Sequence, residues 1–460
     1  MNWQHVLLAM LPEHILLVGI VLLIFLELTS ERPRGALALA LLTVVAATAA
    51  ATLLATRGYA SAPFAGHFSV DAATLTAKAV VLALVLPTLL LSRDDFSETR
   101  FHILLLSSVY GVCLLISSDS FLTMFLGLEL MSLPVYVLVL LGFQRPESPE
   151  AALKYLVLGG TATATFLMGV SLLYGGTGTL ELAAFSRALG SPNTMAQAAV
   201  VLVVVAFFLK AAIVPFHAWA PDAYEGASVP VTAYMSTVIK AGVLLAAARL
   251  FSTTPLGRRM ADLLTLLPLI SMVWGNLAAI RQTSFRRMIA YSSIAHAGYL
   301  FFAFLGAGPG RFQAVMFYIL AYALMNLLAF ASLPRGGDDA ASDRLDSLKG
   351  LYQRRPFAAL MLGLAMLSLA GIPPLPGFVA KFLIFKNVIA AGYTVYAVLG
   401  LIGSYLGIYF YLRVIQYAFM SPDTVQQPSN QRTLALSASV LCLVPAVLVG
   451  LFPGWFMSQL

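Results

Sequence analysis

The sequence predicts an all-α integral membrane protein with fourteen membrane-spanning helices. Three observations predict this fold class. The chain is 60% hydrophobic and only 10% charged, whereas soluble domains are about half apolar and a quarter charged. Its apolar residues fall into runs of roughly 20, which is the length of helix that crosses a bilayer core about 30 Å thick. The stretches between these runs are too short to form a separate soluble domain.

The predicted spans follow one another along residues 1–460 as a single polytopic membrane domain. No lysine or arginine and no small-residue cleavage site accompany the first apolar run, so we expect a retained helix there and not a signal peptide. We expect spans near residues 5–29, 35–56, 70–92, 101–118, 120–143, 151–174, 198–219, 228–251, 262–280, 286–306, 312–333, 357–391, 395–419 and 433–456.

Lysine and arginine are concentrated in alternate loops, for example at Arg93, Arg145, Arg287 and Arg354. Loops that are rich in these residues face the cytoplasm. With fourteen spans, both termini are then expected on the periplasmic side. The basic residues form no cluster of the kind that binds nucleic acid, so no nucleic-acid partner is expected.

A few ionisable residues lie deep in the predicted spans and are the candidate functional residues: Glu129, Lys210, Lys240, Lys381 and His296. A lysine at the bilayer centre costs about 2.5–3.5 kcal/mol, and such residues are usually functional. Burial favours the neutral form of an ionisable group, and a nearby opposite charge favours its ionised form. A group balanced between the two effects can take up and release a proton. We therefore expect Glu129 to set the proton affinity of Lys210, and Lys240 and His296 to continue a proton path.

Several of these positions also have a simpler interpretation. Lys78 could belong to a structural ion pair, and His296 could be a hydrogen-bonded structural histidine. Lys154 and Arg249 lie near span ends and could extend their charged groups to the membrane surface. Four costly groups at similar depth nevertheless favour a conduction path over coincidence. These four are Glu129, Lys210, Lys240 and Lys381.

Two predicted spans contain helix breakers at membrane depth, near residues 215 and 375. The first reads FLKAAIVPFHAWAP, with Pro215, and the second reads GIPPLPGFVAKF. Proline removes a backbone donor and clashes with the preceding turn. Paired interrupted helices in two halves of a chain are typical of transporters with inverted repeats. His217 lies in the first break, either as a cap on freed carbonyl groups or as a proton relay, and the sequence leaves both open.

At these motifs the chain resembles the proton-translocating antiporter-like subunits of respiratory complex I, a family that includes subunits of Mrp-type cation/proton antiporters. The resemblance covers residues of about 100–420. The matching segments are GLELMSLPVY with Glu129, FLKAAIVPFHAWAPDAYEGASVPVTAYMSTVIKAG with Lys210 and Lys240, YSSIAHAGY with His296, and GIPPLPGFVAKF with Lys381.

The resemblance implies two inverted five-helix repeats, at 100–251 and 262–419, each with one broken helix. N-terminal helices would occupy 1–99, and a C-terminal helix 433–456. In this family the glutamate at position 129 pairs with the lysine at 210. Lys240 and His296 would link the two half-channels, and Lys381 would face the second half-channel.

The resemblance also implies a proton-translocating subunit of an NADH:quinone oxidoreductase in the inner membrane of a bacterium. Its expected partners are the M-type subunit, the small K-, J- and A-type membrane subunits, the peripheral redox arm and the lipid bilayer. No cofactor is expected in this chain, since FMN and iron–sulfur clusters belong to partner subunits. The sequence agrees, because it has neither a dinucleotide-binding glycine fingerprint nor a cysteine ligand set. Lys381 replaces the glutamate of the M-type, and the chain lacks the lateral helix of the L-type, which favours the remaining, compact type.

Three alternatives remain open at this stage. A subunit of an Mrp-type cation/proton antiporter or of a membrane-bound hydrogenase would have the same helices and lysines. A solute symporter would place its binding site at the broken helices, near the membrane midplane. A purely structural scaffold is the third, but it would not need buried charges at Glu129, Lys210, Lys240 and Lys381.

Overall fold

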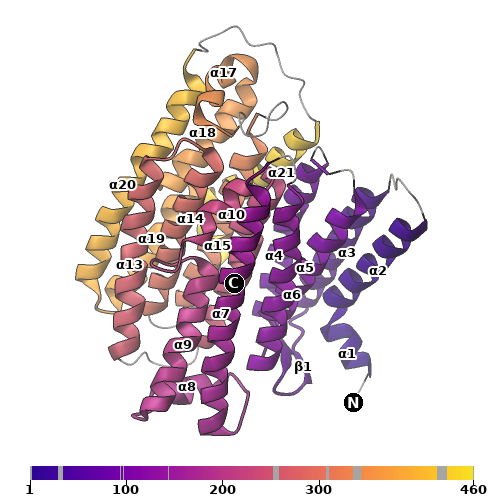
Figure 1. Cartoon of the computed structure of the whole chain (residues 1–460), viewed down its shortest axis with the longest axis vertical. Helices are drawn as coiled ribbons and strands as arrows, with labels where there is room; N and C mark the ends of the chain where they lie inside the picture. Colours follow the sequence, from indigo (N-terminus) through magenta and orange to yellow (C-terminus); the bar gives the residue numbers. More distant parts are fainter. Residues whose placement is uncertain are drawn as a thin grey trace. The chain divides into compact units, whose positions relative to one another are not determined.

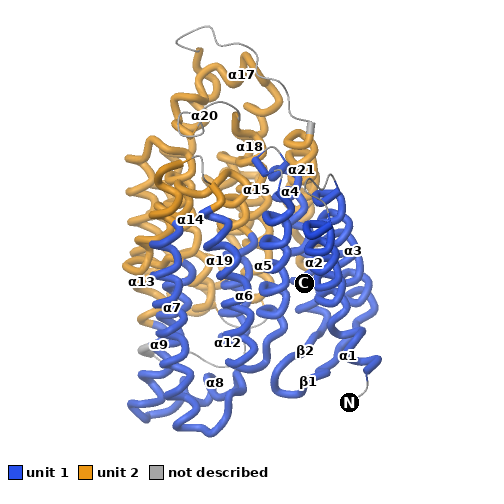
Figure 2. The backbone as a smooth tube through the Cα atoms, turned by 45° about the vertical axis from the view of Figure 1, so that its right-hand side comes forward, with its two compact units in different colours: residues 1–140, 152–211, 238–261 blue, residues 141–151, 212–237, 262–460 orange. Residues whose placement is uncertain are grey.

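The structure is a computed structural model that describes residues 3–29, 35–93, 95–96, 98–142, 145–251, 258–306, 310–334, 343–421 and 433–458. The chain forms two compact units (Figure 2). Unit 1 consists of Met1–Leu140, Ala152–Ala211 and Val238–Ala261, and unit 2 of Leu141–Ala151, Ala212–Thr237 and Asp262–Leu460.

Unit 1 is built almost entirely from long apolar helices (Figure 1). The one exception among its described residues is a two-stranded antiparallel hairpin between the third and fourth helices. Its elements are α1 Trp3–Ala9, α2 Leu11–Thr29, α3 Ala36–Thr56, β1 Ser61–Phe64, β2 Phe68–Val70, α4 Ala72–Ser92, α5 Thr99–Ile116, α6 Phe121–Leu140, most of α7 Ser148–Thr177, α8 Ala183–Leu189, α9 Thr194–Ala211 and α12 Lys240–Phe251.

Unit 2 is also helical. Two of its helices, α10 and α19, each begin directly after a break in the helical chain. The elements of unit 2 are α10 Trp219–Gly226, α11 Val229–Tyr234, most of the π-helix η1 Met235–Ile239, most of α13 Arg258–Ile280, α14 Phe285–Phe302, η2 Ala303–Leu305, α15 Gly310–Ala331, η3 Leu345–Leu348, α17 Leu351–Arg354, α18 Pro356–Ala370, α19 Pro376–Ala390, α20 Thr394–Phe419, α21 Thr433–Leu451 and α22 Pro453–Met457.

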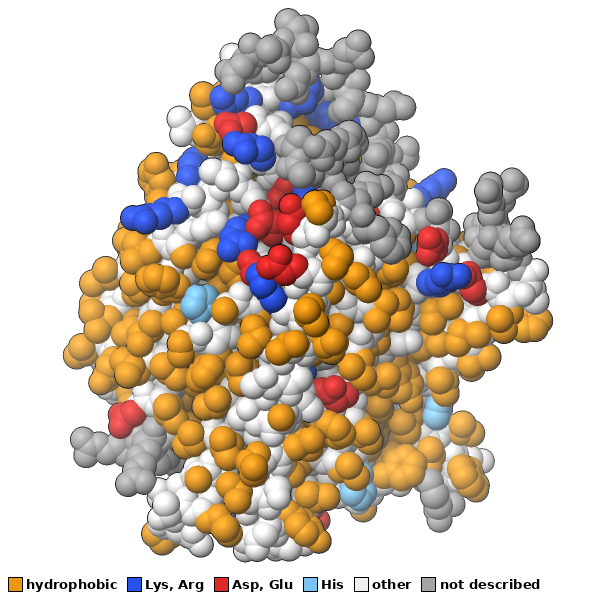
Figure 3. Space-filling view, in the orientation of Figure 1, with side chains coloured by type: hydrophobic (Ala, Val, Ile, Leu, Met, Phe, Trp, Pro, Cys, Tyr) orange, Lys and Arg blue, Asp and Glu red, His pale blue; other side chains and the backbone are white. Residues whose placement is uncertain are grey.

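Thirteen helices among the described residues are long and apolar enough to cross a membrane. Their outward faces are apolar as well: Leu28, Val395 and Tyr405 are 80%, 70% and 73% exposed. Hydrophobic side chains cover most of the face in Figure 3, and most of its charged side chains gather toward one end. Large exposed apolar surfaces are unfavourable in water, so lipid is the solvent of these faces. The prediction of a helical membrane protein is therefore confirmed.

The structure differs from the predicted spans in three places. The range 5–29 is divided between α1 and α2, which meet at Met10. The range 357–391 is two half-helices, α18 and α19, and neither is long enough to count as a span alone. The hairpin of β1 and β2 was not predicted. It forms because Gly66 adopts φ 73° at the turn, a left-handed conformation that favours glycine.

Small residues let the helices of unit 1 pack closely. A Cβ atom on Gly111 of α5 would lie 2.3 Å from the backbone nitrogen of Met131 on α6, and one on Gly19 of α2 would lie 2.3 Å from the side chain of Thr43 on α3. Close backbone approach at small residues is how helices associate inside a bilayer, where the hydrophobic effect gives no help. α5 packs against both α2 and α6 and thereby holds the N-terminal helices and the helix of Glu129 together.

Candidate functional site

The first helix break lies where the sequence predicted it, near residue 215. α9 ends at Ala211, and Ala212 adopts φ 62°, which is uncommon for a residue other than glycine. α10 begins only at Trp219. The backbone N–H of Val214, inside the break, donates to Ser271 Oγ at 2.8 Å. A side chain thus satisfies part of the interrupted backbone, as membrane depth requires.

The second break has the same construction. α18 ends at Ala370, Gly371 adopts φ 90°, and α19 begins at Pro376 after the two prolines 373 and 374. Gly377 brings the start of α19 against the end of α18, because a Cβ at this position would lie 1.8 Å from Ser368 O. Its backbone N–H donates to Ser368 Oγ at 3.1 Å.

Glu129 and Lys210 form an ion pair in unit 1. Glu129 Oε1 on α6 lies 3.5 Å from Lys210 Nζ on α9, in the last turn before the first break. Thr163 on α7 donates its hydroxyl to the same carboxylate oxygen, and Lys210 Nζ donates to Ser132 Oγ at 3.2 Å. The lysine side chain is 6% exposed and the carboxylate 23%. Two hydroxyls therefore bond the two charged groups of this pair beside an interrupted helix.

Lys240 lies in a different setting of the same unit. It begins α12 directly after η1, a π-helix. The hydroxyls of Ser236 and Thr237 bond back to Ala233 O, at 3.0 and 2.6 Å, within this wide turn. The lysine is only 6% exposed. π-Helical turns are rare and occur frequently at functional sites, which agrees with the predicted role of Lys240.

Lys381 is the corresponding buried lysine of unit 2, yet its partners differ. Its Nζ donates to Ala370 O at 3.0 Å and to Ser404 Oγ of α20 at 2.9 Å, and it lies 5.2 Å from the centre of the Tyr299 ring. Ala370 is the last residue of α18, so the ammonium group meets the C-terminal end of a half-helix. Freed carbonyls and the negative end of the helix dipole stabilise a cation there.

His296 on α14 is held between two tyrosines of unit 2. Tyr318 on α15 lies 2.7 Å from its Nδ1, and Tyr411 on α20 lies 3.0 Å from its Nε2. The Tyr411 hydroxyl continues to Ser292 at 2.5 Å. The hydrogen-bonded interpretation of His296 is thus met geometrically, but hydroxyl–imidazole chains also conduct protons, so a relay is equally compatible.

A cavity of about 10 Å³ separates His296 from the second break. Its walls include Tyr318 and Tyr322 on one side and Ser368, Gly377 and Ala380 on the other. This volume is about that of one water molecule, and the cavity lies between the hydrogen-bonded chain of His296 and the start of α19.

The three secondary candidates have separate environments. His217 accepts a hydrogen bond at Nε2 from the indole of Trp274, at 3.2 Å, within unit 2. Lys154 is partly exposed on α7. Lys78 is fully buried in unit 1 and forms an ion pair with Glu13 at 2.6 Å. Lys78 therefore forms the ion pair expected from its simpler interpretation. Its partner, Glu13, was not among the candidate residues named from the sequence.

Arg249, in the last turn of α12, bonds the end of a neighbouring helix. Its guanidinium bonds Ile116 O at 2.9 Å and pairs with Asp119, which closes the end of α5. In unit 2 the guanidinium of Arg413 likewise donates to Ile280 O at 2.7 Å and to Gln282 O at 2.6 Å. A cation on the last carbonyls of a helix is favourable because these groups have no partner within the helix.

Groups that could hold a metal ion, with three or more histidine, cysteine or acidic side chains, do not occur among the described residues. Cys113 and Cys442 are both buried and free. The polar groups described at the site are carboxylate, amine, imidazole and hydroxyl groups. These groups exchange protons.

Residues that the sequence analysis missed are mostly hydroxyls: Thr163, Ser404, Tyr318 and Tyr411. Serine, threonine and tyrosine are common in membrane helices, so nothing in the sequence singles these four out. Glu13 did carry a signal, because it lies in an apolar run of a chain in which Lys78 needed an opposite charge.

Fold and site together define a polytopic membrane protein of the antiporter-like class, with charged side chains beside broken helices. A family model described as "NADH:quinone oxidoreductase/Mrp antiporter, TM" matches residues 118–407. Subunit N of NADH-quinone oxidoreductase from Pelobacter propionicus is 38% identical over 93% of this chain and 92% of its own length. The Geobacillus kaustophilus subunit N is 37% identical over 98% and 96%. The chain belongs to the NADH:quinone oxidoreductase/Mrp antiporter family, and within it to the subunit N type, which is the compact type expected from Lys381.

Solved structures agree with this assignment. A chain of respiratory complex I from Thermus thermophilus is 35% identical, covers 97% of this chain and 98% of its own, and has a TM-score of 0.84. A chain of the Mrp complex from Dietzia sp. is 22% identical, covers 98% and 96%, and has a TM-score of 0.85. The latter likeness concerns the fold alone. The Mrp-type alternative therefore shares the architecture but is much less similar in sequence.

Proposed function

We propose that this chain translocates protons across the bacterial inner membrane as the N-type subunit of the membrane arm of NADH-quinone oxidoreductase, coupled to electron transfer in other subunits. Glu129, Lys210, Lys240, His296 and Lys381 would carry the protons. The observation that carries this proposal is the Glu129–Lys210 pair, in which a buried lysine is balanced by a single carboxylate beside a helix break. Moving either partner changes which protonation state is favoured, and electron transfer elsewhere could drive that movement.

Hydrogen bonds support a division into two inverted five-helix repeats. In unit 1, Phe121 N donates to Leu180 O and Leu182 N to Asp119 O, while in unit 2 Phe285 N donates to Asp343 O and Leu345 N to Thr283 O. The helix-end carbonyls of Ile116 and Ile280, which Arg249 and Arg413 bind, follow the same spacing along the sequence. Matching residues lie 164 positions apart: 116 and 280, 121 and 285, 249 and 413.

Each interval of this repeat contains five predicted crossings, counting the broken helix as one. An odd number of crossings inverts the second copy relative to the first, which agrees with fourteen spans and with both termini on the periplasmic side. The closing contact of the second copy is a buried one, since Asp343 pairs with Arg286 at 2.9 Å. Burial raises the pKa of the Asp343 carboxyl, and the Arg286 charge opposes that rise.

Glu129→Gln tests the proposal directly. The substitution keeps the shape of the side chain and removes the charge that balances Lys210. We expect proton pumping and coupled NADH oxidation by the assembled complex in vesicles to fall together, by about tenfold or more. Glu147→Gln, at an exposed position, is the control and should leave both rates unchanged. Normal pumping by an assembled Glu129→Gln complex would refute the role of the pair.

The antiporter alternative makes a different prediction about partners. A subunit of an Mrp-type antiporter would purify without flavin and iron–sulfur proteins, whereas the proposed function requires FMN, iron–sulfur clusters and the M-type and small membrane subunits in the same complex. Purification in mild detergent, followed by identification of the subunits, separates the two. The higher identity to subunit N sequences favours the redox complex.

A further inference from the structure

We infer that Glu13 and Lys78 form a second proton-exchanging pair, which lies outside the two five-helix repeats. Glu13 lies near the start of α2 and Lys78 in the second turn of α4. Both side chains are 0% exposed, and Glu13 Oε1 lies 2.6 Å from Lys78 Nζ. The pair lies before residue 118, where the match to the family model begins.

The hydrogen-bonding capacity of this pair is largely unused. Apart from the contact between them, neither the Glu13 carboxylate nor the Lys78 ammonium has a hydrogen-bond partner in the described part of the chain. A carboxylate accepts about four hydrogen bonds and an ammonium donates three. Buried groups with such spare capacity are usually hydrated by internal water, and a hydrated pair has a route for protons. Tyr110 and Cys113 of α5 are titratable side chains close to Glu13.

The use of lysine distinguishes this pair from the structural clamps of the chain. The buried or half-buried clamps use arginine: Arg249 with Asp119, Arg286 with Asp343, and Arg287 with Asp222 and Glu225. Two of these guanidinium groups also bond backbone carbonyls, Arg249 on Ile116 O and Arg286 on Ala227 O. Arginine stays charged under all ordinary conditions, whereas a buried lysine can lose its proton.

Glu129–Lys210 and Glu13–Lys78 are two lysine ion pairs within the spanning helices. The first is the pair proposed to carry protons. The second has the same chemistry, with one carboxylate and one amine buried together. Glu13 is a poor metal ligand, because the Lys78 ammonium repels cations from the single carboxylate of the pair.

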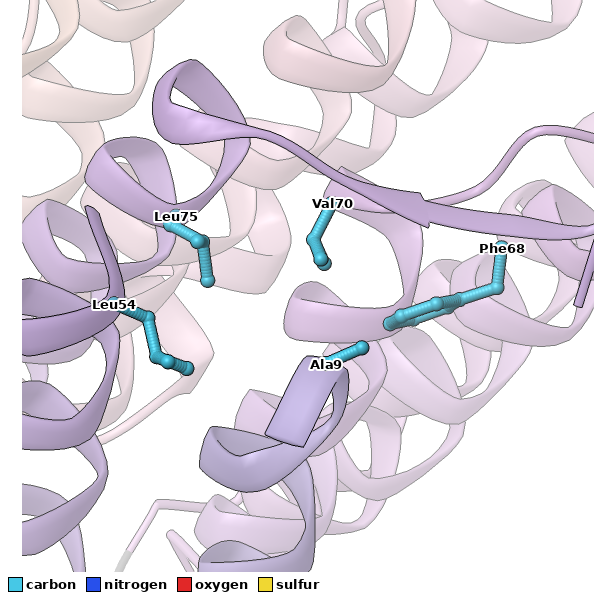
Figure 4. Packing of buried hydrophobic residues seen from close by; sticks show 5 residues of the cluster. All are labelled: Ala9, Leu54, Phe68, Val70 and Leu75. Carbon is cyan, nitrogen blue, oxygen red and sulfur yellow. The ribbon is translucent and has the colours of Figure 1, made fainter. Parts of the chain in front are cut away.

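An apolar cluster covers the pair toward the N-terminal end of α2. It consists of Ala9, Leu54, Phe68, Val70 and Leu75, whose side chains converge from α1, α3, α4 and β2 (Figure 4). Lys78 lies one helical turn after Leu75 on α4, and Glu13 follows Ala9 across the junction of α1 and α2, so both charges come just after cluster residues in the chain. The cluster would therefore seal the pair from the aqueous phase on that side.

Phe68 connects the seal to the charge state of the pair. Lys78 Nζ lies 4.9 Å from the centre of the Phe68 ring, a cation–π contact that exists only while the lysine is charged. The hairpin that carries Phe68 is bonded to the end of α5, where Ser69 N donates to Ser117 O at 3.1 Å. Loss of the Lys78 charge would loosen the hairpin and open the sealed end.

The proton balance of one cycle is simple. Glu13 takes up one proton and becomes neutral, which leaves the Lys78 charge without a partner. Lys78 then releases one proton and becomes neutral as well. Transfer of the Glu13 proton to Lys78 restores the original pair. One proton enters, one leaves, and no redox partner is needed.

Lys78→Arg is the decisive variant, because arginine keeps the ion pair but does not release a proton. In the assembled complex in vesicles we expect coupled proton pumping to fall by about tenfold. A structural ion pair would tolerate arginine, so unchanged pumping would overturn the inference. Lys386→Arg, on an exposed part of α19, is the matched control.

A spectroscopic measurement keeps the inference testable if Lys78→Arg does not assemble. Infrared difference spectra of the complex between low and high pH should contain a protonated-carboxyl band that Glu13→Gln abolishes. Identical difference spectra for both proteins would show that Glu13 never takes up a proton and would reject the site. The pumping assay rests on the proposed function, but the spectra do not. If Glu129→Gln pumps normally, the proposed function fails, whereas the loss of the Glu13 band would still establish this site.

Discussion

At the scale of single residues, hydroxyl groups help to hold the buried lysines beside the two helix breaks. Lys210 and Lys381 both donate to a serine, yet only Lys210 has a carboxylate partner among the contacts found, and a threonine bonds that carboxylate in turn. The charged groups could be predicted because charge is costly in a membrane. Their hydroxyl partners could not, since a serine or threonine in an apolar helix commonly bonds its own backbone, as Thr165 does to Thr161 O.

Thr163→Val should weaken proton translocation without disturbing the fold. Valine has the shape of threonine but cannot donate to Glu129, so the ionised carboxylate loses a charge-assisted hydrogen bond worth about 1.5–3 kcal/mol. Coupled NADH oxidation in vesicles should fall several-fold, and the pH at which the rate is half-maximal should shift. Thr165→Val, two residues along α7 and half-buried like Thr163, is the control. A pH profile identical to that of the unmodified complex would contradict this role of Thr163.

At the scale of elements, the two breaks show what proline and glycine patterns can and cannot predict. The positions near 215 and 375 followed from prolines at membrane depth. The side of each break on which the lysine amine lies did not follow from these patterns. Lys210 precedes its break, whereas Lys381 follows its own, but the Lys381 side chain reaches back to Ala370 at the end of α18. The two lysines lie on opposite sides of their breaks in the sequence. The length of the lysine side chain reduces this difference in space.

The hairpin and the division of the first span were beyond the reach of composition. β1 and β2 together contain seven residues, and their pairing depends on the turn at Gly66 and on bonds to the end of α5. A hydropathy window of about 19 residues cannot detect such short elements. The same limit explains why no helix was predicted for α10, which lies between the predicted spans at 198–219 and 228–251.

Gly377→Ala should destabilise the second break. The added methyl group would lie 1.8 Å from Ser368 O, so the start of α19 must move away from the end of α18. Overpacking of this kind costs about 1–3 kcal/mol, and here it would also disturb the cavity beside His296. Thermal unfolding of the purified complex should show a lower Tm for this subunit. Gly160→Ala, where nothing lies within 4 Å of the new Cβ, should leave the Tm unchanged.

At the scale of the whole molecule, each unit holds its own buried lysine beside or across a helix break. Unit 1 contains the ion pair of Glu129 and Lys210. In unit 2, Lys381 donates to a carbonyl and a hydroxyl group, and His296 and two tyrosines lie nearby. The fold class and the family membership followed from the sequence because the long motif around Lys210 is specific. The division of the polar groups between two units did not, because it depends on packing over long sequence separations.

A comparison of single and double variants tests whether the two units serve one proton path. If protons pass both lysines in series, Lys210→Ala and Lys381→Ala should each reduce coupled pumping strongly, and the double variant should be no worse than the more damaged single variant. Residues that act as a unit are non-additive in this way, whereas independent parallel paths would give partial single losses that add in the double variant. Lys386→Ala, an exposed lysine on the same helix as Lys381, controls for the removal of a charge. Partial single losses that add in the double variant of a fully assembled complex would exclude a single path, and the two units would then have to be assigned separate proton routes.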